Sequence, residues 1–427
     1  MLSETLPALL DRLDRHTAVL DERSSRLSRI RLALVLSGGL LAIIVGNVVG
    51  SGAGWSVALI VLIAFAGLVR IHDRVEAALD RARLWRSLQA RHLARIERDW
   101  DTLGPAPVGP PAGHAYASDL DVTGDRSLLH LLDTTGTVVG HRRLRGWLLG
   151  DDPDGRTIRQ ERVQALVRQR RLRDRLALLG HEAAGSIDER WDDTPIHAWL
   201  TAETPPSLRR WAVVLGGLSA LTFVLVVVAL TGGPSLWAYS FALYAVLYLS
   251  MMGSVASVFD KAYDLQKALS QARVLLAFVE AAPAGRDPVL SPVWAPFRGE
   301  RSPRQRLGRL RRIVDAASIA RNDIGGVILN VLLPYNLFLT IALDRLRAQL
   351  AELVDPWLDA LAEIEALSAL AALADRQPDT VFPDLADGGT LLDARDLRHP
   401  LLRDPVGNDA TLERGEVIIV TGSNMSG

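Results

Sequence analysis

The sequence predicts a mainly α-helical fold with two transmembrane helical hairpins, a domain of long helices, and the start of an α/β domain at the C-terminal end. Three observations lead to this prediction. Two long stretches carry no charged residue, and leucine and alanine repeat at helical spacing through much of the second half of the chain. An apolar, strand-like run close to residue 420 then leads into a glycine-bounded loop.

The composition indicates how the chain is organised. With 427 residues it is too long for one ordinary hydrophobic core, so we expect two or three structural units. Hydrophobic residues make up 49% of a chain that is also 23% charged, so the apolar residues must be concentrated in particular segments. There is no cysteine, which excludes disulfides, cysteine nucleophiles and thiolate metal sites. The formal net charge of −1 argues against a general polyanion-binding protein.

The first charge-free stretch lies between Arg31 and Arg70. It contains two apolar runs, residues 32–49 and 53–69, joined by the turn-forming residues 50–52. A helix needs about 20 mostly apolar residues to cross a bilayer, so both runs are slightly short and require local thinning or help from flanking residues. We interpret the stretch as a transmembrane hairpin.

The second charge-free stretch lies between Arg210 and Asp260 and predicts a second hairpin. Its two runs, residues 211–230 and 236–259, have the length of full spans and are separated by the turn-forming residues 231–234. The alternative is a buried helical hairpin inside a large soluble domain. A soluble core helix normally keeps one polar face, however, and these runs have none.

The flanking basic residues predict the orientation of both hairpins. Clusters of arginine precede and follow the first hairpin, Arg209 and Arg210 precede the second, and Lys261 and Lys267 follow it. Neither short connecting loop carries a charge. By the positive-inside tendency, both hairpins enter and leave the bilayer on the cytoplasmic side. We therefore expect a multi-pass protein of the inner or plasma membrane, with its soluble parts in the cytoplasm and the lipid bilayer as a partner.

A motif-like segment follows the first hairpin. Residues 127–149 predict a short apolar helix, a polar turn and a second helix, and a third helix begins after Gly155. By itself this pattern indicates a helical packing corner. As a string it resembles the opening of the MutS core domain, in which a leucine-rich helix runs into an Asp-x-Thr-x-Thr turn and then a Gly-x-Arg-x-Leu segment. The matching positions are Asp133, Thr135, Thr137, Gly140, Arg142, Leu144, Trp147, Pro153, Ile158 and Arg162.

Residues 260–376 are almost entirely helical in pattern, and residues 336–374 predict one long helix that contains Pro356. Long helices of this kind also build the levers of the MutS core. Phe278 and Glu280 match the Phe-x-Glu signature by which mismatch-binding MutS proteins insert an aromatic ring beside a mispair. Here they lie on an amphipathic helix after a membrane span, so we interpret Phe278 as a core residue.

The C-terminal segment contains the most specific signal. Residues 415–421 predict a buried strand, followed by the loop Gly422, Ser423, Asn424, Met425, Ser426 and Gly427. A strand that leads into such a loop is how a P-loop begins: its backbone N–H groups bind the β-phosphate, and only small residues let the backbone approach. The following lysine, for the phosphates, and hydroxyl residue, for Mg²⁺, would come after the end of this sequence.

This loop resembles the MutS variant of the P-loop, Gly-Pro-Asn-Met-x-Gly-Lys-Ser. Upstream, His399-Pro400 and Asn408-Asp409 match the way that family enters its ATPase domain. Two positions depart from the family pattern. Ser423 replaces the usual proline, and Pro405 and Val406 stand where the family has an aromatic residue that packs on adenine.

The resemblance divides the chain into four regions. These are N-terminal helices with the first hairpin (residues 1–103), a proline- and glycine-rich linker (104–118), a MutS-like core and lever domain with the second hairpin inserted (119–380), and the start of a P-loop ATPase domain (381–427). It implies a membrane-anchored, homodimeric ATPase that uses ATP and Mg²⁺. We expect the present chain to be inactive, because the P-loop lysine is missing.

Three functions remain open at this point. The resemblance implies an ATPase that couples nucleotide state to lever movement and binds DNA without reading mismatches. An ABC-type transporter component also joins membrane spans to a P-loop, but its loop usually reads G-x-x-G-x-G-K, which Asn424 and Met425 do not fit. The third function is a non-catalytic membrane scaffold.

Overall fold

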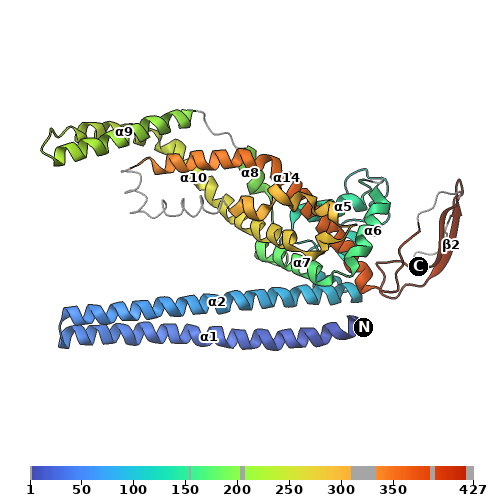
Figure 1. The fold of residues 1–427 in the computed structure, drawn as a ribbon. Helices are drawn as coiled ribbons and strands as arrows, with labels where there is room; N and C mark the ends of the chain where they lie inside the picture. The colour runs from blue at the N-terminus through green and yellow to red at the C-terminus, as the bar shows by residue number, and fades with distance from the viewer. Residues whose placement is uncertain (1, 153–154, 202–206, 309–332, 385–389, 420–427) are drawn as a thin grey trace. The chain divides into compact units, whose positions relative to one another are not determined.

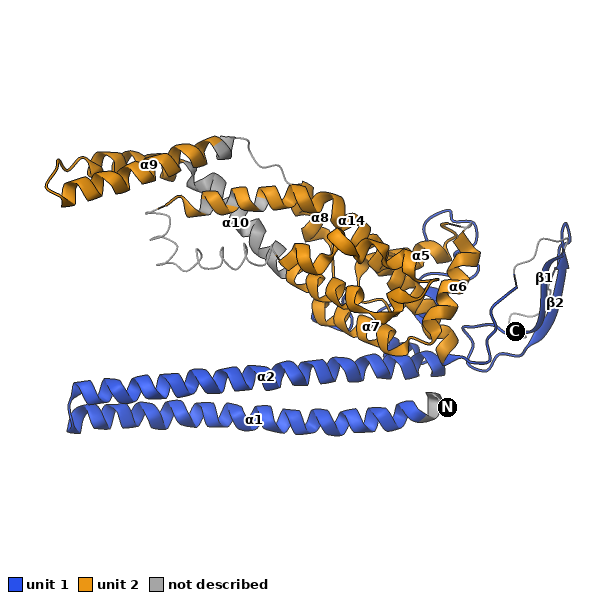
Figure 2. Cartoon of the chain, in the orientation of Figure 1, with its two compact units in different colours: residues 1–132, 185–189, 376–427 blue, residues 133–184, 190–375 orange. Residues whose placement is uncertain are grey.

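The computed structural model describes residues 2–152, 155–201, 207–308, 333–384 and 390–419. It confirms the mainly α-helical prediction, with 72% helix and 4% strand. The chain divides into two compact units, shown in different colours in Figure 2. Unit 1 comprises residues 1–132, 185–189 and 376–427, and unit 2 comprises residues 133–184 and 190–375.

Unit 1 begins with a hairpin of two 47-residue helices, α1 (Leu2–Val48) and α2 (Ser51–Glu97), which lie side by side along their length (Figure 1). Val49 and Gly50 form the turn between them, and Gly50 has a φ of 126°, a conformation that favours glycine. The helix backbones approach closely near this turn, because a Cβ atom on Gly54 would lie only 2.7 Å from the Cα of Gly46.

The apolar halves of α1 and α2 present their side chains outward. Leu36, Ile43 and Ile60 are all more than 60% exposed, and only 6% of the most apolar window in each helix is buried. Both helices are long and apolar enough to cross a membrane, so the first predicted hairpin is confirmed as a pair of candidate spans. The turn lies at Val49–Gly50, one residue before the predicted 50–52, because Ser51 already belongs to α2.

Beyond the apolar segment, α1 and α2 continue as a polar pair. Arg83 bonds Asp21 at 2.7 Å and Arg86 bonds Asp14 at 2.8 Å, while Leu20 and Leu79 pack between the helices. The spans are thus the apolar ends of longer helices. The sequence pattern alone did not reveal this continuity, because the charged halves resemble separate surface helices.

The remaining elements of unit 1 are short. They are α3 (Trp100–Leu103), α4 (Leu128–Leu132), β1 (Thr390–Leu397) and β2 (Asn408–Glu413). Residues 104–118, the predicted linker, contain no helix or strand. The two strands form an antiparallel hairpin in which Ala394 pairs with Ala410.

The predicted buried strand at residues 415–421 is wrong for its described part. Arg414 and Gly415 form a turn, and residues 416–419 are irregular. Val417 and Ile419 are both 81% exposed. Among the described residues the sheet has only the strands β1 and β2, so no described strand bonds this run.

Unit 2 contains the helical core. Its helices are α5 (Val138–Leu148), α6 (Arg156–Val167), α7 (Arg170–Ala184), α8 (Thr194–Thr201), α9 (Ser207–Leu230), α10 (Trp237–Ala281), η2 (Pro283–Arg286), α11 (Ser291–Trp294), η3 (Ala295–Phe297), η4 (Gly299–Arg301) and α14 (Tyr335–Arg376). The three helices predicted within and after residues 127–149 are present as α4 of unit 1 and as α5 and α6 of unit 2.

The second hairpin consists of α9 and the first part of α10. Residues 210–230 of α9 form a third candidate membrane span. In α10 the described apolar part runs from Trp237 to Ser250, which is shorter than a full span, and the side chains of residues 251–267 lie outside the description. The structure therefore contains three long apolar helices, and the predicted fourth span is shown only in part.

The 42-residue helix α14 confirms the long helix predicted from residues 336–374. Near its middle, the indole N–H of buried Trp357 donates to the carbonyls of Pro296 and Arg301, at 3.0 and 2.9 Å. Further along, small and branched residues from 358 to 372 are largely buried, so this half of α14 forms the centre of the core.

Candidate functional site

The predicted nucleotide loop, Gly422, Ser423, Asn424, Met425, Ser426 and Gly427, lies outside the described residues. The described residues before it form the β1–β2 hairpin. His399 and Pro400 lie in the connection between the strands, and Asn408 and Asp409 open β2. The Asp409 side chain accepts a bond from the backbone N–H of Asp396 at 2.9 Å, so this conspicuous residue pair stabilises the hairpin itself.

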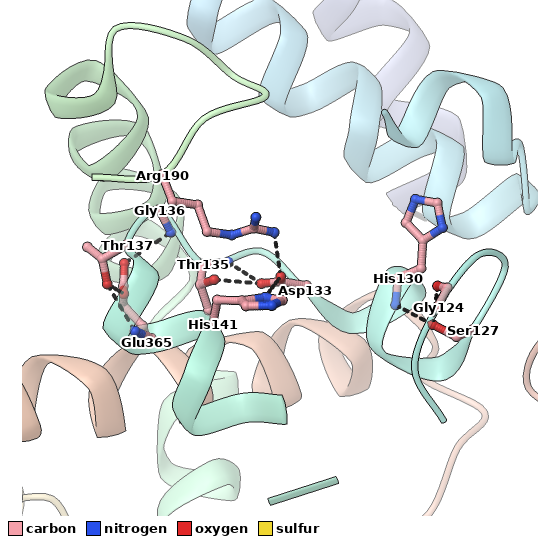
Figure 3. A network of polar contacts seen from close by, with 11 residues as sticks. Gly124, Ser127, His130, Asp133, Thr135, Gly136, Thr137, His141, Arg190 and Glu365 are labelled. Carbon is pink, nitrogen blue, oxygen red and sulfur yellow. Dashed lines mark hydrogen bonds and ion pairs between the residues drawn. The ribbon is translucent and has the colours of Figure 1, made fainter. Parts of the chain in front are cut away.

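The most developed polar site among the described residues is a buried network in unit 2 (Figure 3). It joins the turn before α5, the segment before α8, and α14. Its members are Asp133, Thr135, Gly136, Thr137, His141, Arg190 and Glu365. We call this set the Asp133–Glu365 network.

Local capping chemistry shapes the turn before α5. The Asp133 carboxylate accepts bonds from the backbone N–H and the hydroxyl of Thr135, at 3.0 and 2.6 Å. Thr137 is the N-cap of α5, with extended backbone and a hydroxyl that accepts from the N–H of Gly140 at 3.0 Å. The Asp-x-Thr-x-Thr pattern is therefore a turn followed by a helix cap, and each hydroxyl has a defined bond.

Asp133 also bonds the two basic members of the network. His141 Nδ1 and an Arg190 guanidinium nitrogen both lie 2.6 Å from Asp133 Oδ2. Burial alone would raise the pKa of this carboxyl. The hydrogen bond with His141 and the positive charges of Arg190 and His141 outweigh burial, so the pKa of Asp133 lies well below its usual range. Asp133 is therefore a buried carboxylate whose charge is matched.

Arg190 reaches the network because the segment that contains it is hydrogen-bonded to the turn before α5. Trp191 donates its backbone N–H to the carbonyl of Gly136, and its carbonyl accepts from Val138, both at 2.9 Å. This short parallel bridge places the Arg190 side chain over Asp133, as Figure 3 shows. Two segments that are more than 50 residues apart in the sequence are thereby held together.

Glu365 connects the turn to α14. Its carboxylate accepts bonds from the backbone N–H of Gly136, at 3.1 Å, and from the hydroxyl of Thr137. Only 2% of the residue is exposed. Burial raises the pKa of Glu365 to about 7, against the opposing effect of the bonds from Thr137 and Gly136. Near neutral pH this carboxyl therefore titrates inside the core.

Two glycines allow these close approaches. A Cβ on Gly136 would lie 2.6 Å from the Cα of Gly180, and a Cβ on Gly140 would lie within the Glu365 side chain. Both contacts involve groups that cannot easily move, because one is backbone and the other is a buried carboxylate. The glycines therefore permit the turn to pack against α7 and α14.

The other residues of the MutS-like string differ in their surroundings, and one of them contacts α14. Arg162 bonds Glu363 of α14 at 2.5 Å, Trp147 lies under the guanidinium of Arg159 at 4.3 Å, and Leu144 is fully buried. Ile158 is 53% exposed, and Pro153 lies outside the described residues. Three of the matched positions, Thr137, Gly140 and Arg162, thus contact Glu363 or Glu365 of α14.

The geometry indicates what this site can do. Its groups are buried and mutually bonded, and no set of three or more metal-ligating side chains occurs in the described part of the chain. The network is suited to join segments and to respond to protonation. Its Asp133 carboxylate bonds Thr135, His141 and Arg190, and its Glu365 carboxylate bonds Gly136 and Thr137. Sequence reasoning found Asp133, Thr135 and Thr137 but missed Glu365 and Arg190. The available signal for Glu365 was an acidic residue at the edge of the uncharged, alanine- and leucine-rich run 366–374.

The Phe-x-Glu match has a structural role. Glu280 accepts bonds from the hydroxyl of Ser302, at 2.7 Å, and from the backbone N–H of Arg304, at 3.0 Å. Phe278 is partly buried on the same helix, α10. Glu280 therefore anchors the segment after η4.

Comparisons with known proteins identify no relative. No protein-family model matches the chain, and neither a curated protein nor a solved structure matches it.

Proposed function

We propose that this chain is the membrane-anchored portion of a MutS-like ATPase, in which nucleotide state is coupled to movement of the long helix α14. The observation that carries the proposal is the Asp133–Glu365 network. It joins the MutS-like string to α14, and the chain later reaches the MutS-like loop sequence Gly422–Gly427. Three long apolar helices support the membrane anchoring.

In this proposal the backbone of the loop Gly422–Gly427 would bind the phosphates of ATP, and the hydroxyl residue that the family places after the loop lysine would hold Mg²⁺. Bound nucleotide supplies the binding energy for the conformational change. The chain's own residues transmit that change: the Asp133–Glu365 network couples the α5–α6 corner to α14. Hydrolysis follows the positioning and charge-stabilising chemistry of P-loop enzymes.

The test uses a chain that continues through the whole nucleotide-binding domain, purified in detergent. We expect it to bind and hydrolyse ATP, and we expect Gly427→Val to abolish both, since its side chain would block the backbone approach to phosphate. Glu352→Gln, an exposed change on α14, is the matched control and should keep normal turnover. Unchanged turnover in Gly427→Val would show that this loop is not the nucleotide site, and no turnover in any variant would favour a scaffold.

For DNA, we propose binding without sequence or mismatch preference, carried by arginine contacts to phosphate. The Phe-x-Glu match does not supply a mismatch wedge, because Glu280 is bonded to Ser302 and Arg304. Such binding should weaken steeply with salt, since each neutralised phosphate releases counterions. The measurement is affinity for perfect and mismatched duplexes across a salt titration. A strong, salt-insensitive preference for the mismatch would contradict the proposal.

A homodimer is the assembly that the resemblance implies. Multi-angle light scattering of the detergent-solubilised protein would measure its mass, with the detergent contribution subtracted. A mass near twice 46.5 kDa is expected for the present chain if its helical core carries the dimer contact.

A further inference from the structure

A third apolar region of the sequence lies outside both predicted hairpins. The 20 residues between Asp323 and Asp344 include no charged residue. The structure describes this region from residue 333 onward, where it forms the first turns of α14 (Tyr335–Arg376). A charge-free run of this length is unusual at the start of a helix that is otherwise rich in charged residues.

The first turns of α14 pack against the second transmembrane hairpin. Leu337, which is 1% exposed, belongs to one buried cluster with Ala212, Leu215 and Tyr244 of α9 and α10. Ile341 packs against the same cluster. The start of α14 therefore shares a core with α9, a helix long and apolar enough to cross the membrane.

Phe338 lies beside the same hairpin but faces outward. A Cβ on Gly216 would lie 3.0 Å from the tip of the Phe338 ring, so α9 and the ring are in close contact. Even so, Phe338 is 46% exposed, and Leu333 is 49% exposed. On α9, Val213 and Val214 are exposed to a similar or greater extent, at 76% and 49%. Phe338 thus continues the outward apolar surface of a candidate membrane span.

The positions of the nearest charged residues on α9 and α14 agree with Phe338 lying on the outward surface of a membrane span. At 1.5 Å rise per residue, Gly216 lies about 9 Å along α9 from Arg210, and Phe338 lies about 9 Å along α14 from Asp344. Gly216 and Phe338 are in contact, so the first charges on the two helices lie at comparable distances from the contact point. Both helices can therefore place their charges at the membrane surface while their apolar turns lie below it.

We infer that the N-terminal turns of α14, from Tyr335 to residue 343, are embedded in the bilayer beside α9, with Phe338 in contact with lipid acyl chains. This adds a membrane-inserted element to the two hairpins. It does not depend on the ATPase proposal. It also makes α14 a direct physical connection between the membrane and the Asp133–Glu365 network.

The experiment uses the whole chain in vesicles of phosphatidylcholine and phosphatidylglycerol. Because the chain has no cysteine, Phe338→Cys introduces a single labelling site for a bimane fluorophore. Val214→Cys on α9 is the lipid-facing reference, with nearly the same exposed fraction. Ala351→Cys, an exposed position on the same helix and about 20 Å further along, is the aqueous reference.

We expect lipids with a nitroxide on the upper acyl chain to quench the label at 338 to within about twofold of the label at 214, with little quenching at 351. Aqueous iodide should show the reverse order, since it cannot enter the acyl region. Quenching at 338 by iodide and not by nitroxide lipid would overturn the inference. Quenching by neither would also overturn it, because protein would then cover the position. Circular dichroism of each variant checks that its helical content is retained.

Discussion

The buried carboxyl of Glu365 offers the sharpest test of the Asp133–Glu365 network. The change Glu365→Gln keeps the shape of the side chain and can still accept from the N–H of Gly136, while its amide can donate to the Thr137 oxygen. It removes only the ability to ionise. A difference between the wild type and Glu365→Gln in how stability depends on pH therefore reports the titration of this one carboxyl.

The sign and size of the effect follow from the raised pKa. Below pH 4.5 the carboxyl is protonated in both the folded and unfolded states, and ionisation has no effect on stability. Between pH 4.5 and about 7 the unfolded chain loses the proton while the folded protein keeps it, so stability falls as pH rises. At about 1.4 kcal/mol per pKa unit, the total loss is about 3 kcal/mol by pH 7, and it stays constant above.

Hydrogen exchange measured by mass spectrometry on peptides covering residues 133–141 provides the assay. After correction for the intrinsic pH dependence of exchange, the local opening free energy of the wild type should fall by up to about 3 kcal/mol from pH 4.5 to 7. In Glu365→Gln this fall should disappear. The control is Glu363→Gln, two residues away on α14, where the carboxylate bonds Arg162 and is 23% exposed. It should retain the wild-type fall. Identical profiles for the wild type and Glu365→Gln would refute the reasoning.

Three further experiments test other parts of the structure. Asp133→Asn removes a buried carboxylate whose pKa is depressed in the folded protein. The stability that this charge contributes above the pKa of aspartate in the unfolded chain is therefore lost. We expect a loss of about 1–3 kcal/mol at pH 7 in the same exchange assay, and less at pH 3. Gly180→Ala would place a methyl 2.6 Å from the Cα of Gly136 and should cost about 1–3 kcal/mol, measured in the same way. Single cysteines at Gly52 and Gly232 should react with a membrane-impermeant maleimide only from outside the cell, and labelling only from the cytoplasmic side would contradict the predicted topology.

The elements predicted best from sequence were those specified by a local pattern. The charge-free runs identified the membrane hairpin of α1 and α2, and the leucine spacing identified α14. The strand at residues 415–421 failed because a strand requires hydrogen-bonding neighbours, and an apolar run specifies none. The start of α14 was predicted to within one residue, but its charge-free run was not singled out, because the run contains Pro334 and leads directly into a charged amphipathic helix.

Only the part of the candidate site that lies in the turn before α5 could be predicted from the sequence. Asp133, Thr135 and Thr137 act through residues close in sequence, so a turn-and-cap pattern was visible. Arg190 and Glu365 reach the same turn through tertiary packing, across about 55 and 230 positions of the chain, and no local pattern encodes such contacts. A glutamate at the edge of a long run of alanine and leucine is nevertheless a signal that a partner must exist.

The two ends of α14 make a final prediction possible. Leu337 packs on the membrane hairpin and Glu365 bonds the turn before α5, and these residues are about 42 Å apart along the helix. If α14 moves as one rigid rod, removing the polar anchor must change the environment at its apolar end. We expect Glu365→Ala to shift the emission of a bimane at Phe338→Cys, whereas Glu352→Ala, an exposed change between the two anchors, should not. Pro356 lies between the anchors and removes one backbone hydrogen bond, so an unchanged emission would show that α14 bends there and that the two ends are uncoupled.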